Sequence, residues 1–311
     1  MKKTVLILLA TLFGLFAGAQ NRADWDGLKE DITLIVANDL GRNGYYDQRP
    51  IAATMGEMAE AIGPEAVLAL GDVFHYEGVR STTDPLWMSN YENIYQHPEL
   101  MVEWLPVCGN HEYRGNTQAI VDYSGVSRRW AMPAKYYART FEEDGTTLKV
   151  ILIDTTPLID KYRNDSAKYP DAAGEEIEAQ LAWLERELAG AAEDWIVVAG
   201  HHPIFAETSK SEGERKDMQA RVDQILRRHR VDMYVCGHIH NFQHIKPEGS
   251  NIDYIVNSSA SQSRTKVGSV DGTVFVSGKG GFSVLGASAK TLTLSMIDAE
   301  GNILYTVSRK K

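Results

Sequence analysis

Aspartate, asparagine and histidine side chains recur in this 311-residue chain directly after short apolar runs. Carboxylate oxygens, amide oxygens and imidazole nitrogens are ligands that suit transition-metal ions such as Zn, Fe or Mn. The residues with this setting are Asp39, Asp72, His75, Asn110, His111, His201, His202, His238 and His240. The pattern therefore predicts a metal centre built from residues that are far apart in the sequence.

The number of candidates predicts more than one ion. A single ion takes about four protein ligands, and a carboxylate such as Asp72 has two oxygens with which to bridge a pair. Two ions about 4 Å apart can activate water and stabilise both the attacking and the leaving oxygen of a displacement. A lone histidine is more often structural, so His97 and His229, which lack this setting, are interpreted as structural; His244 stays ambiguous.

The elements that must position these side chains alternate between apolar β-branched runs and amphipathic stretches, which indicates an α/β fold. Predicted strands are Ile32–Ala37, Ala66–Leu70, Trp104–Cys108, Lys149–Ile153, Trp195–Ala199 and Met233–Cys236. Predicted helices are Ile51–Ile62, Glu175–Leu188 and Glu214–His229. Near the end, Thr291–Ile297 and Ile303–Val307 flank a turn and predict a hairpin.

The candidate ligands follow the carboxyl ends of the predicted strands. Ligands of open α/β sheets bind beyond those ends, so we expect the side chains to converge on one rim. A glycine stands directly before the first candidate ligand in four of the five segments: Gly71, Gly109, Gly200 and Gly237. Glycine lets the backbone turn sharply there and brings each ligand close to a shared centre.

Length and charge narrow the class of protein. The length favours one domain, expected to span residues 20–311. The formal net charge of -10 argues against a nucleic-acid partner. A small anionic substrate is compatible with that charge, because bound metal ions supply positive charge locally.

The first 19 residues are interpreted as a signal peptide. Lys2 and Lys3 precede the apolar run Val5–Phe16, and Ala17-Gly18-Ala19 resembles a cleavage site, so the mature chain is expected to begin at Gln20. We therefore expect a periplasmic or extracellular protein without a stable membrane anchor. A permanent N-terminal anchor is the alternative, although the run is short for a membrane span.

The two cysteines stand at the ends of predicted strands. Cys108 and Cys236 each come directly before a glycine and a candidate ligand segment. An exported protein could pair them. Because free cysteine packs well as a small hydrophobe, we expect both to be unpaired core residues.

Five motifs in order resemble those of the calcineurin-like metallophosphoesterases, and in particular the small, tartrate-resistant type of purple acid phosphatase. They are Asn38-Asp39-Leu40-Gly41, Gly71-Asp72-x-x-His75, Gly109-Asn110-His111-Glu112, Gly200-His201-His202-Pro203 and Gly237-His238-Ile239-His240. The resemblance runs from about Ile32 to about Arg309 and includes the segments 127–133 and 180–184. It implies a four-layer α/β/β/α sandwich with a dimetal site at the strand ends.

The resemblance also implies roles for particular residues. One ion would be held by Asp39, Asp72, His75 and His240. The other would be held by Asp72, Asn110, His201 and His238, with Asp72 as the bridge. His111 would stand outside the ligand shell and donate a proton to the leaving oxygen or stabilise charge there. Glu112 is a candidate for orienting His111.

Three positions depart from the family pattern. His75 replaces the tyrosine whose phenolate gives the purple enzymes their colour and favours trivalent iron. We therefore expect a colourless protein that prefers two divalent ions (Fe, Zn or Mn) and has a pH optimum above the acidic range. Asn38 and His202 replace glycine and tyrosine, which concerns substrate contacts.

The predicted function is hydrolysis of phosphate monoesters by attack of a metal-bound hydroxide, with Asp72, Asn110 and His111 essential to catalysis. Two alternatives stay open: a phosphodiesterase or pyrophosphatase on the same fold, and a non-catalytic exported metal-binding module. Arg42, Tyr45 and Arg114 are conceivable phosphate contacts, although surface ion pairs explain them equally well. The substrate and the oligomeric state are not determined by the sequence, and a monomer is expected.

Overall fold

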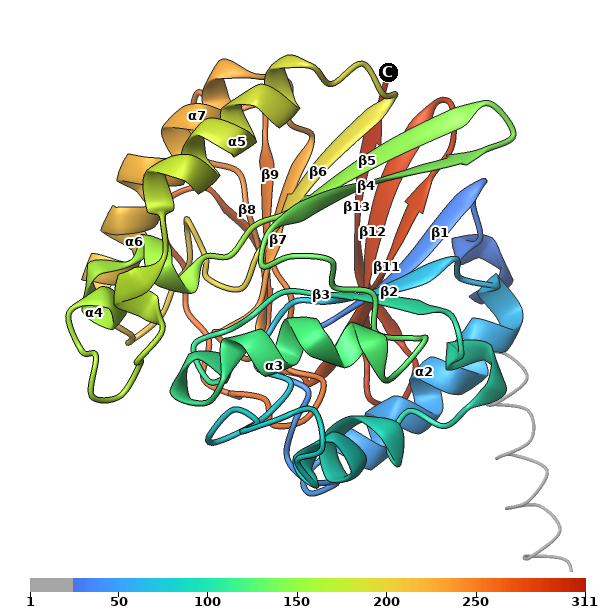
Figure 1. Ribbon diagram of the computed structural model, residues 1–311. Coiled ribbons are helices and arrows are strands. Elements are labelled where there is room, and N and C mark those ends of the chain that lie inside the picture. Colours follow the sequence, from blue (N-terminus) through green and yellow to red (C-terminus); the bar gives the residue numbers. More distant parts are fainter. Residues whose placement is uncertain (1–24) are drawn as a thin grey trace, which may run out of the picture.

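Two sheets form the centre of the molecule (Figure 1). This computed structural model describes residues 25–311, so the predicted signal peptide lies outside the described residues. The first sheet has the strand order β13-β12-β11-β1-β2-β3 and the second the order β10-β8-β9-β7-β6-β5-β4. The predicted α/β sandwich is confirmed.

The strands of the first sheet are β1 Ile32–Ala37, β2 Ala66–Ala69, β3 Glu103–Pro106, β11 Gly281–Ala287, β12 Thr291–Asp298 and β13 Ile303–Lys310. Those of the second are β4 Tyr137–Glu143, β5 Thr146–Leu152, β6 Trp195–Ala199, β7 Met233–Cys236, β8 Phe242–Ile245, β9 Asp253–Val256 and β10 Thr273–Ser277. In each sheet the site-bearing strands are parallel, as in β1 with β2 and β6 with β7. Their carboxyl ends therefore lie at one edge of each sheet.

The helices lie on the outer sides of the two sheets (Figure 1). They are α2 Gln48–Ile62, α3 Thr117–Asp122, α4 Asp160–Arg163, α5 Ile177–Ala189, α6 Glu212–Met218 and α7 Gln224–Arg228. Helices α5, α6 and α7 cover the second sheet, and α2 and α3 lie beside the first. Single turns of 3-10 helix occur in the connections, and π-helical turns span Met88–Glu92 and Gln219–Asp223.

Burial explains which strands were predictable. Every residue of β1, β6 and β7 is buried, and strands covered on both faces consist of continuous apolar runs. The six predicted parallel strands are all present, with bounds that differ by up to three residues. The predicted helix Glu214–His229 is present as a continuous helical segment from Glu212 to Arg228, in which a π-helical turn joins α6 to α7; His229 is extended and lies outside it.

One continuous cluster of buried hydrophobic residues extends from Trp25 to Val307 and joins both sheets. Cys108 and Cys236 belong to it, and both are unbridged, so the expected core role of the cysteines is confirmed. No helix within residues 25–311 is long and apolar enough to cross a membrane.

Candidate metal centre

The predicted ligands meet at the carboxyl edges of both sheets. Asp39 follows β1, and Asp72 and His75 follow β2. Asn110 and His111 follow β3, whereas His201 and His202 follow β6 and His238 and His240 follow β7. The expected rim is therefore shared by two sheets, and all of these residues except the half-buried His111 are buried.

Four of these residues adopt an unusual backbone conformation. Asp39, Asp72, His238 and His240 have φ angles of 51°, 53°, 70° and 66°, in the left-handed region that non-glycine residues rarely occupy. Such a residue costs about 1–3 kcal/mol and persists only where the surroundings enforce it. The fold therefore stores strain at these four positions, as functional sites often do.

Close packing of two glycines brings the loops together. A Cβ on Gly109 would lie 2.3 Å from Oδ1 of Asp72, and one on Gly71 would lie 2.7 Å from Nδ1 of His201. Both contacts are shorter than any real Cβ makes. Glycine at these two positions is thus what lets Asp72 approach the loops after β3 and β6.

One half of the centre surrounds Asp39. Its Oδ1 lies 2.9 Å from Nε2 of His240, and Nε2 of His75 lies 3.5 Å from Oδ2 of Asp72. These contacts are ion pairs and not hydrogen bonds, so Oδ1 of Asp39 and Nε2 of His75 are buried without a hydrogen-bond partner. Buried polar atoms seldom stay unpaired, so these two call for a ligand.

The other half includes Asn110, His201 and His238 and shares Asp72 with the first. Oδ2 of Asp72 is 3.2 Å from Nε2 of His201, which is itself 3.2 Å from Nδ1 of His238. The side-chain oxygen of Asn110 is buried and unpaired. Nε2 of His75 and Nε2 of His201 thus both approach Oδ2 of Asp72, while Oδ1 of Asp72 accepts a hydrogen bond from the backbone N–H of His111 (2.9 Å).

The second ring nitrogen of each histidine is fixed from outside the centre. Nδ1 donates to a backbone carbonyl oxygen in three of them: His75 to Gly41 (3.0 Å), His201 to Leu70 (2.9 Å) and His240 to Gln262 (2.6 Å). In His238 the outer nitrogen is Nε2, 3.1 Å from the carboxylate of Glu214. In His75, His201 and His240 the carbonyl partner places the proton on Nδ1 and directs Nε2 at the centre, an arrangement typical of metal-binding histidines.

The negative charge of Asp72 favours a cation beside it. Burial would raise the pKa of Asp72, but the imidazoles of His201 and His111 outweigh it and hold that pKa well below its usual range. Burial likewise opposes a charge on His201, yet Asp72 raises its pKa to about 9. Without a metal, the proton on His201 balances the carboxylate.

His111 lies beside this cluster. Its Nδ1 donates to the carbonyl oxygen of Tyr76 (2.6 Å), so Nε2 faces Asp72 at 3.8 Å. Burial is the main cause that lowers the pKa of His111 to about 3. The ring is therefore neutral at pH 7 when the centre holds no ligand.

Glu112, the sequence candidate for orienting His111, contacts the backbone instead. Its buried carboxylate accepts hydrogen bonds from the backbone N–H groups of Asp72 (2.8 Å), Gly109 (2.6 Å) and Phe74 (3.1 Å). No hydrogen bond joins it to the ring of His111 among the described residues. Glu112 thus holds together the loops after β2 and β3.

The remaining histidines are engaged elsewhere. Both nitrogens of His202 contact hydroxyls, those of Thr155 (2.8 Å) and Tyr162 (3.1 Å). His244 lies between Asp253 and Tyr305. The ring nitrogens of His97 and His229 face Glu60 and Glu185. These contacts give all four a structural role.

Sequence reasoning missed several residues that support the centre. Glu214 and Lys210 both contact His238, and Ser259 and Ser261 donate to the carbonyl oxygen of Asp39. The polar run Asn257-Ser258-Ser259-Ala260-Ser261 directly after the apolar residues of β9 was an available signal for the serines. No comparable signal marked Glu214.

The donor set fits metal ions. The ligand atoms of Asp39, His75 and His240 lie within 4.8 Å of one another, and so do those of Asp39, Asp72 and His201. Three unpaired buried atoms, on Asp39, His75 and Asn110, belong to the same cluster. Two sheets that present carboxylates and imidazoles in this way define a metallophosphoesterase fold with a candidate metal centre.

Comparison with known proteins gives the family. Residues 32–242 match the model of the calcineurin-like phosphoesterase family, and the chain belongs to that family. It is 29% identical over 268 residues to tartrate-resistant acid phosphatase type 5 of Oryctolagus cuniculus, and the aligned region covers 82% of each chain. It is 31% identical over 239 residues to purple acid phosphatase 3 of Arabidopsis thaliana, covering 74% of this chain and 63% of that one. These relatives imply a dimetal centre and phosphoesterase chemistry.

Solved structures share the fold. GAP50, described as the anchor in the inner membrane complex of Plasmodium, superposes with a TM-score of 0.77 at 22% identity and covers 90% of this chain and 88% of its own. The purple acid phosphatase PPD1 of yellow lupin gives a TM-score of 0.62 at 14% identity, with coverage of 90% and 53%. At these identities the likeness concerns the fold alone.

Proposed function

We propose that this chain is a dimetal phosphatase that hydrolyses phosphate monoesters. The observation that carries the proposal is the convergence of Asp39, Asp72, Asn110 and four buried imidazoles, with unpaired atoms on three of these residues. The acid phosphatases among the relatives support the same reaction class. Specificity for monoesters is the part that experiment must establish.

The ligand sets in this proposal are those that the resemblance to the metallophosphoesterases implies, and the clustering of these side chains supports them. Asp39, Asp72, His75 and His240 would hold one ion, and Asp72, Asn110, His201 and His238 the other. When bound, the two ions supply positive charge to the phosphoryl oxygens and lower the pKa of water. His75, as a neutral ligand, favours divalent ions of Fe, Zn or Mn over a trivalent one.

His111 serves the leaving group in this proposal. During hydrolysis an oxygen of water bonds to phosphorus, the ester P–O bond breaks, and the leaving oxygen takes up a proton. Nε2 of His111 faces the centre because Nδ1 is held by Tyr76. A bound phosphate dianion opposes the burial that lowers the pKa of His111 and favours the protonated ring.

The test compares a monoester with a diester on protein loaded with Mn²⁺, Zn²⁺ or Fe²⁺. We expect turnover of phenyl phosphate well above that of diphenyl phosphate. Asp72→Ala and Asn110→Ala should abolish turnover. His111→Ala should lower kcat by about 100-fold or more while metal content stays near normal. His97→Ala, which removes an imidazole outside the centre, is the control.

Other outcomes identify the alternatives. Preference for the diester would indicate a phosphodiesterase. Two bound ions without turnover of any phosphate ester would indicate a metal-binding module.

We also propose that the protein acts outside the cytoplasm, on the basis of its first 19 residues. N-terminal sequencing of the protein isolated from its native cells should find Gln20 first. An intact Met1 would contradict export by this route.

A further inference from the structure

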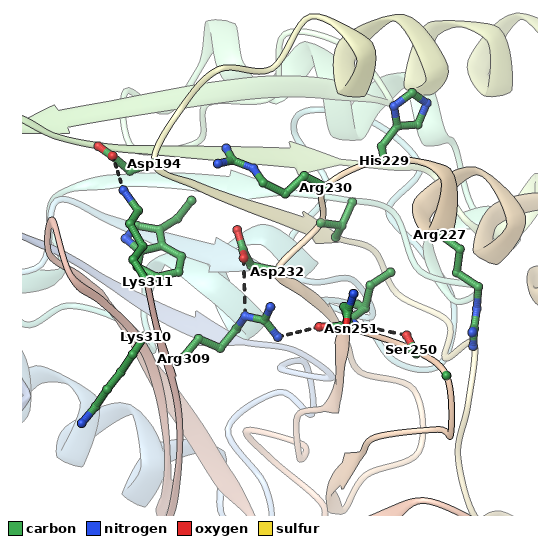
Figure 2. A pocket seen from close by; sticks show the side chains of 14 residues that line it. Asp194, Arg227, His229, Arg230, Asp232, Ser250, Asn251, Arg309, Lys310 and Lys311 are labelled. Carbon is green, nitrogen blue, oxygen red and sulfur yellow. Dashed lines mark hydrogen bonds and ion pairs between the residues drawn. The ribbon is translucent and has the colours of Figure 1, made fainter.

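Two cavities contain cationic side chains, and they differ in whether those charges are paired. The cavity in Figure 2, about 570 Å³, lies at the amino-terminal ends of β6, β7 and β9, on the side away from the metal centre. There Lys311 pairs with Asp194, and Arg309 pairs with Asp232. These two cations are already neutralised by the chain's own carboxylates.

The second cavity adjoins the metal centre. It has a volume of about 540 Å³ and is lined by Arg42, Asn43, Tyr45, Tyr46, His75 and Tyr76. His75 belongs to both places, because its Nε2 faces Asp72 and its ring forms part of the cavity wall. A molecule held at the centre therefore has this cavity directly beside it.

Arg42 places a poorly compensated charge in the cavity wall. Arg42 is only 9% exposed. Its Nε and Nη1 are buried and have no hydrogen-bond acceptor within residues 25–311. The guanidinium carbon lies 4.9 Å from the ring centre of Tyr76 and 6.0 Å from that of Tyr46. Cation–π contact compensates a buried charge only in part, so an anionic ligand would stabilise Arg42.

Two tyrosines, Tyr46 and Tyr76, lie over this charge, and Tyr45 lines the same cavity. Tyr45, Tyr46 and Tyr76 are 72%, 58% and 63% exposed, although tyrosine is usually at least half-buried. Exposed rings gathered around a cavity are typical of a surface that stacks on a planar ligand. The ring of Tyr76 lies 6.3 Å from the rings of both His75 and His111. A planar group joined directly to the reacting phosphate is thus within reach of Tyr76.

The loop that carries these residues is already fixed. The buried side chain of Gln48 accepts hydrogen bonds from the backbone N–H groups of Arg42 (3.0 Å) and Gly44 (2.7 Å). Asn90 accepts one from the N–H of Asn43 (2.8 Å). Because the loop is held in this way, a ligand would lose little free energy in ordering it.

We propose that Arg42, Tyr45, Tyr46 and Tyr76 form the subsite for the leaving group, and that the preferred substrate is a phosphate monoester of a planar ring bearing an anionic substituent. The proposal rests on the proposed function. In the reaction the bond between phosphorus and the ester oxygen breaks, and the water oxygen bonds to phosphorus. The ester oxygen takes up a proton, and the product phenol leaves with its anionic substituent still beside Arg42. A charge-assisted hydrogen bond from the guanidinium supplies the selectivity.

The experiment measures kcat/KM for phenyl phosphate and 4-carboxyphenyl phosphate on metal-loaded protein. Arg42→Met should lower the value for the carboxylated ester about 10-fold or more and that for phenyl phosphate less than about 3-fold. For each ester, the ratio of kcat/KM between the native protein and the variant is independent of the ester's intrinsic reactivity. Arg80→Met, which replaces a side chain that is 91% exposed, is the matched control and should change neither value.

A binding measurement separates this subsite from the hydrolytic activity. Calorimetry with benzylphosphonate and 4-carboxybenzylphosphonate, which cannot be hydrolysed, should give tighter binding of the carboxylated compound to the native protein. Arg42→Met should abolish that difference. Tyr45→Ala should weaken both phosphonates several-fold, because it removes an exposed ring without disturbing the core.

Two results would overturn the proposal. An equal loss for both esters in Arg42→Met would mean that the guanidinium contacts the transferred phosphoryl group. No loss for either ester would mean that Arg42 contacts no substrate. If Arg42→Met does not fold, Arg42→Gln answers the same question. If the native protein hydrolyses neither ester, the proposed function fails, and the phosphonate measurement still decides whether the subsite exists.

Discussion

The carboxylate of Glu214 lies 3.1 Å from Nε2 of His238, on the side of the ring away from His201. Glu214 is buried and also accepts hydrogen bonds from Lys161 (2.6 Å) and Tyr162 (3.1 Å). Helix α6 is thereby connected to the metal centre. The carboxylate favours the His238 tautomer with the proton on Nε2, which leaves the lone pair on Nδ1, whereas Lys210, whose Nζ is also 3.1 Å from Nε2, favours the opposite tautomer.

Replacing this carboxylate should weaken metal binding. We expect Glu214→Gln to lower the affinity for one of the two ions about 10-fold or more, since an amide orients the imidazole less firmly and makes it less basic. Calorimetric titration of the metal-free protein measures this. Glu212→Gln is the control, because Glu212 lies on the same helix and pairs with Lys216 at the surface. Equal affinities in the two variants would refute a positioning role for Glu214.

The close approach of Gly109 to Asp72 gives a second prediction. In Gly109→Ala the new methyl group would lie 2.3 Å from Oδ1 and 2.6 Å from the backbone nitrogen of Asp72. The loop must then shift, at a cost of about 1–3 kcal/mol, and the carboxylate of Asp72 shifts with it. Elemental analysis should find fewer than two ions per chain. Gly125→Ala, which meets nothing within 4 Å, should keep the native metal content.

The pH dependence of stability should reveal Asp154. Burial is the main cause that raises the pKa of Asp154 to about 7, although the phenol of Tyr113 donates a hydrogen bond to it. Because the folded pKa exceeds the unfolded one, the stability that Asp154 contributes is present below about pH 4 and is lost as the pH rises through 7. Asp154→Asn removes this titration.

Urea unfolding at several pH values tests this point. Between pH 5 and pH 8, the free energy of unfolding of Asp154→Asn should gain at least about 1 kcal/mol relative to the native protein. Asp165→Asn, a change at an exposed loop residue, is the control and should show no such trend. A constant difference between Asp154→Asn and the native protein across this range would contradict the prediction.

The parts of the fold that the sequence predicts are those that local patterns determine. Strand β1 is a continuous apolar run that stops at Asn38-Asp39, so both the strand and the ligand position were predictable. Strand β11 was not predicted, although it lies between β1 and β12. It contains Gly281, Ser283 and Gly286, which weaken its strand propensity, and its pairing partners are distant in the sequence.

The same distinction holds at the site. Each metal-ligand candidate follows an apolar run, and glycine precedes several of them, so the sequence marks the cluster. Glu214 belongs instead to the charged segment Glu212-Gly213-Glu214-Arg215-Lys216, which has the pattern of a solvated helix. Only the packing of α6 over the second sheet makes one glutamate buried and the other exposed. Arg42 was considered as a phosphate contact, but its unpaired nitrogens required the structure.

The substitution at His75 gives the last prediction. Its Nε2 is unpaired and faces Asp72 at 3.5 Å, in the position where the purple acid phosphatases that the chain resembles carry tyrosine. A neutral imidazole offers ferric iron no phenolate charge, so the native protein loaded with iron should lack the visible charge-transfer band.

The variant His75→Tyr tests the cause directly. A phenolate at this position would donate charge to ferric iron, so the iron-loaded variant should show a visible band that the zinc-loaded variant lacks. Tyr76→Phe is the control, since Tyr76 is adjacent in sequence but its hydroxyl belongs to the exposed cavity wall. A strong visible band in the iron-loaded native protein would mean that a phenolate other than residue 75 reaches the metal. In that case the exposed tyrosines beside Arg42 would be the first residues to examine, because they line the same cavity as His75.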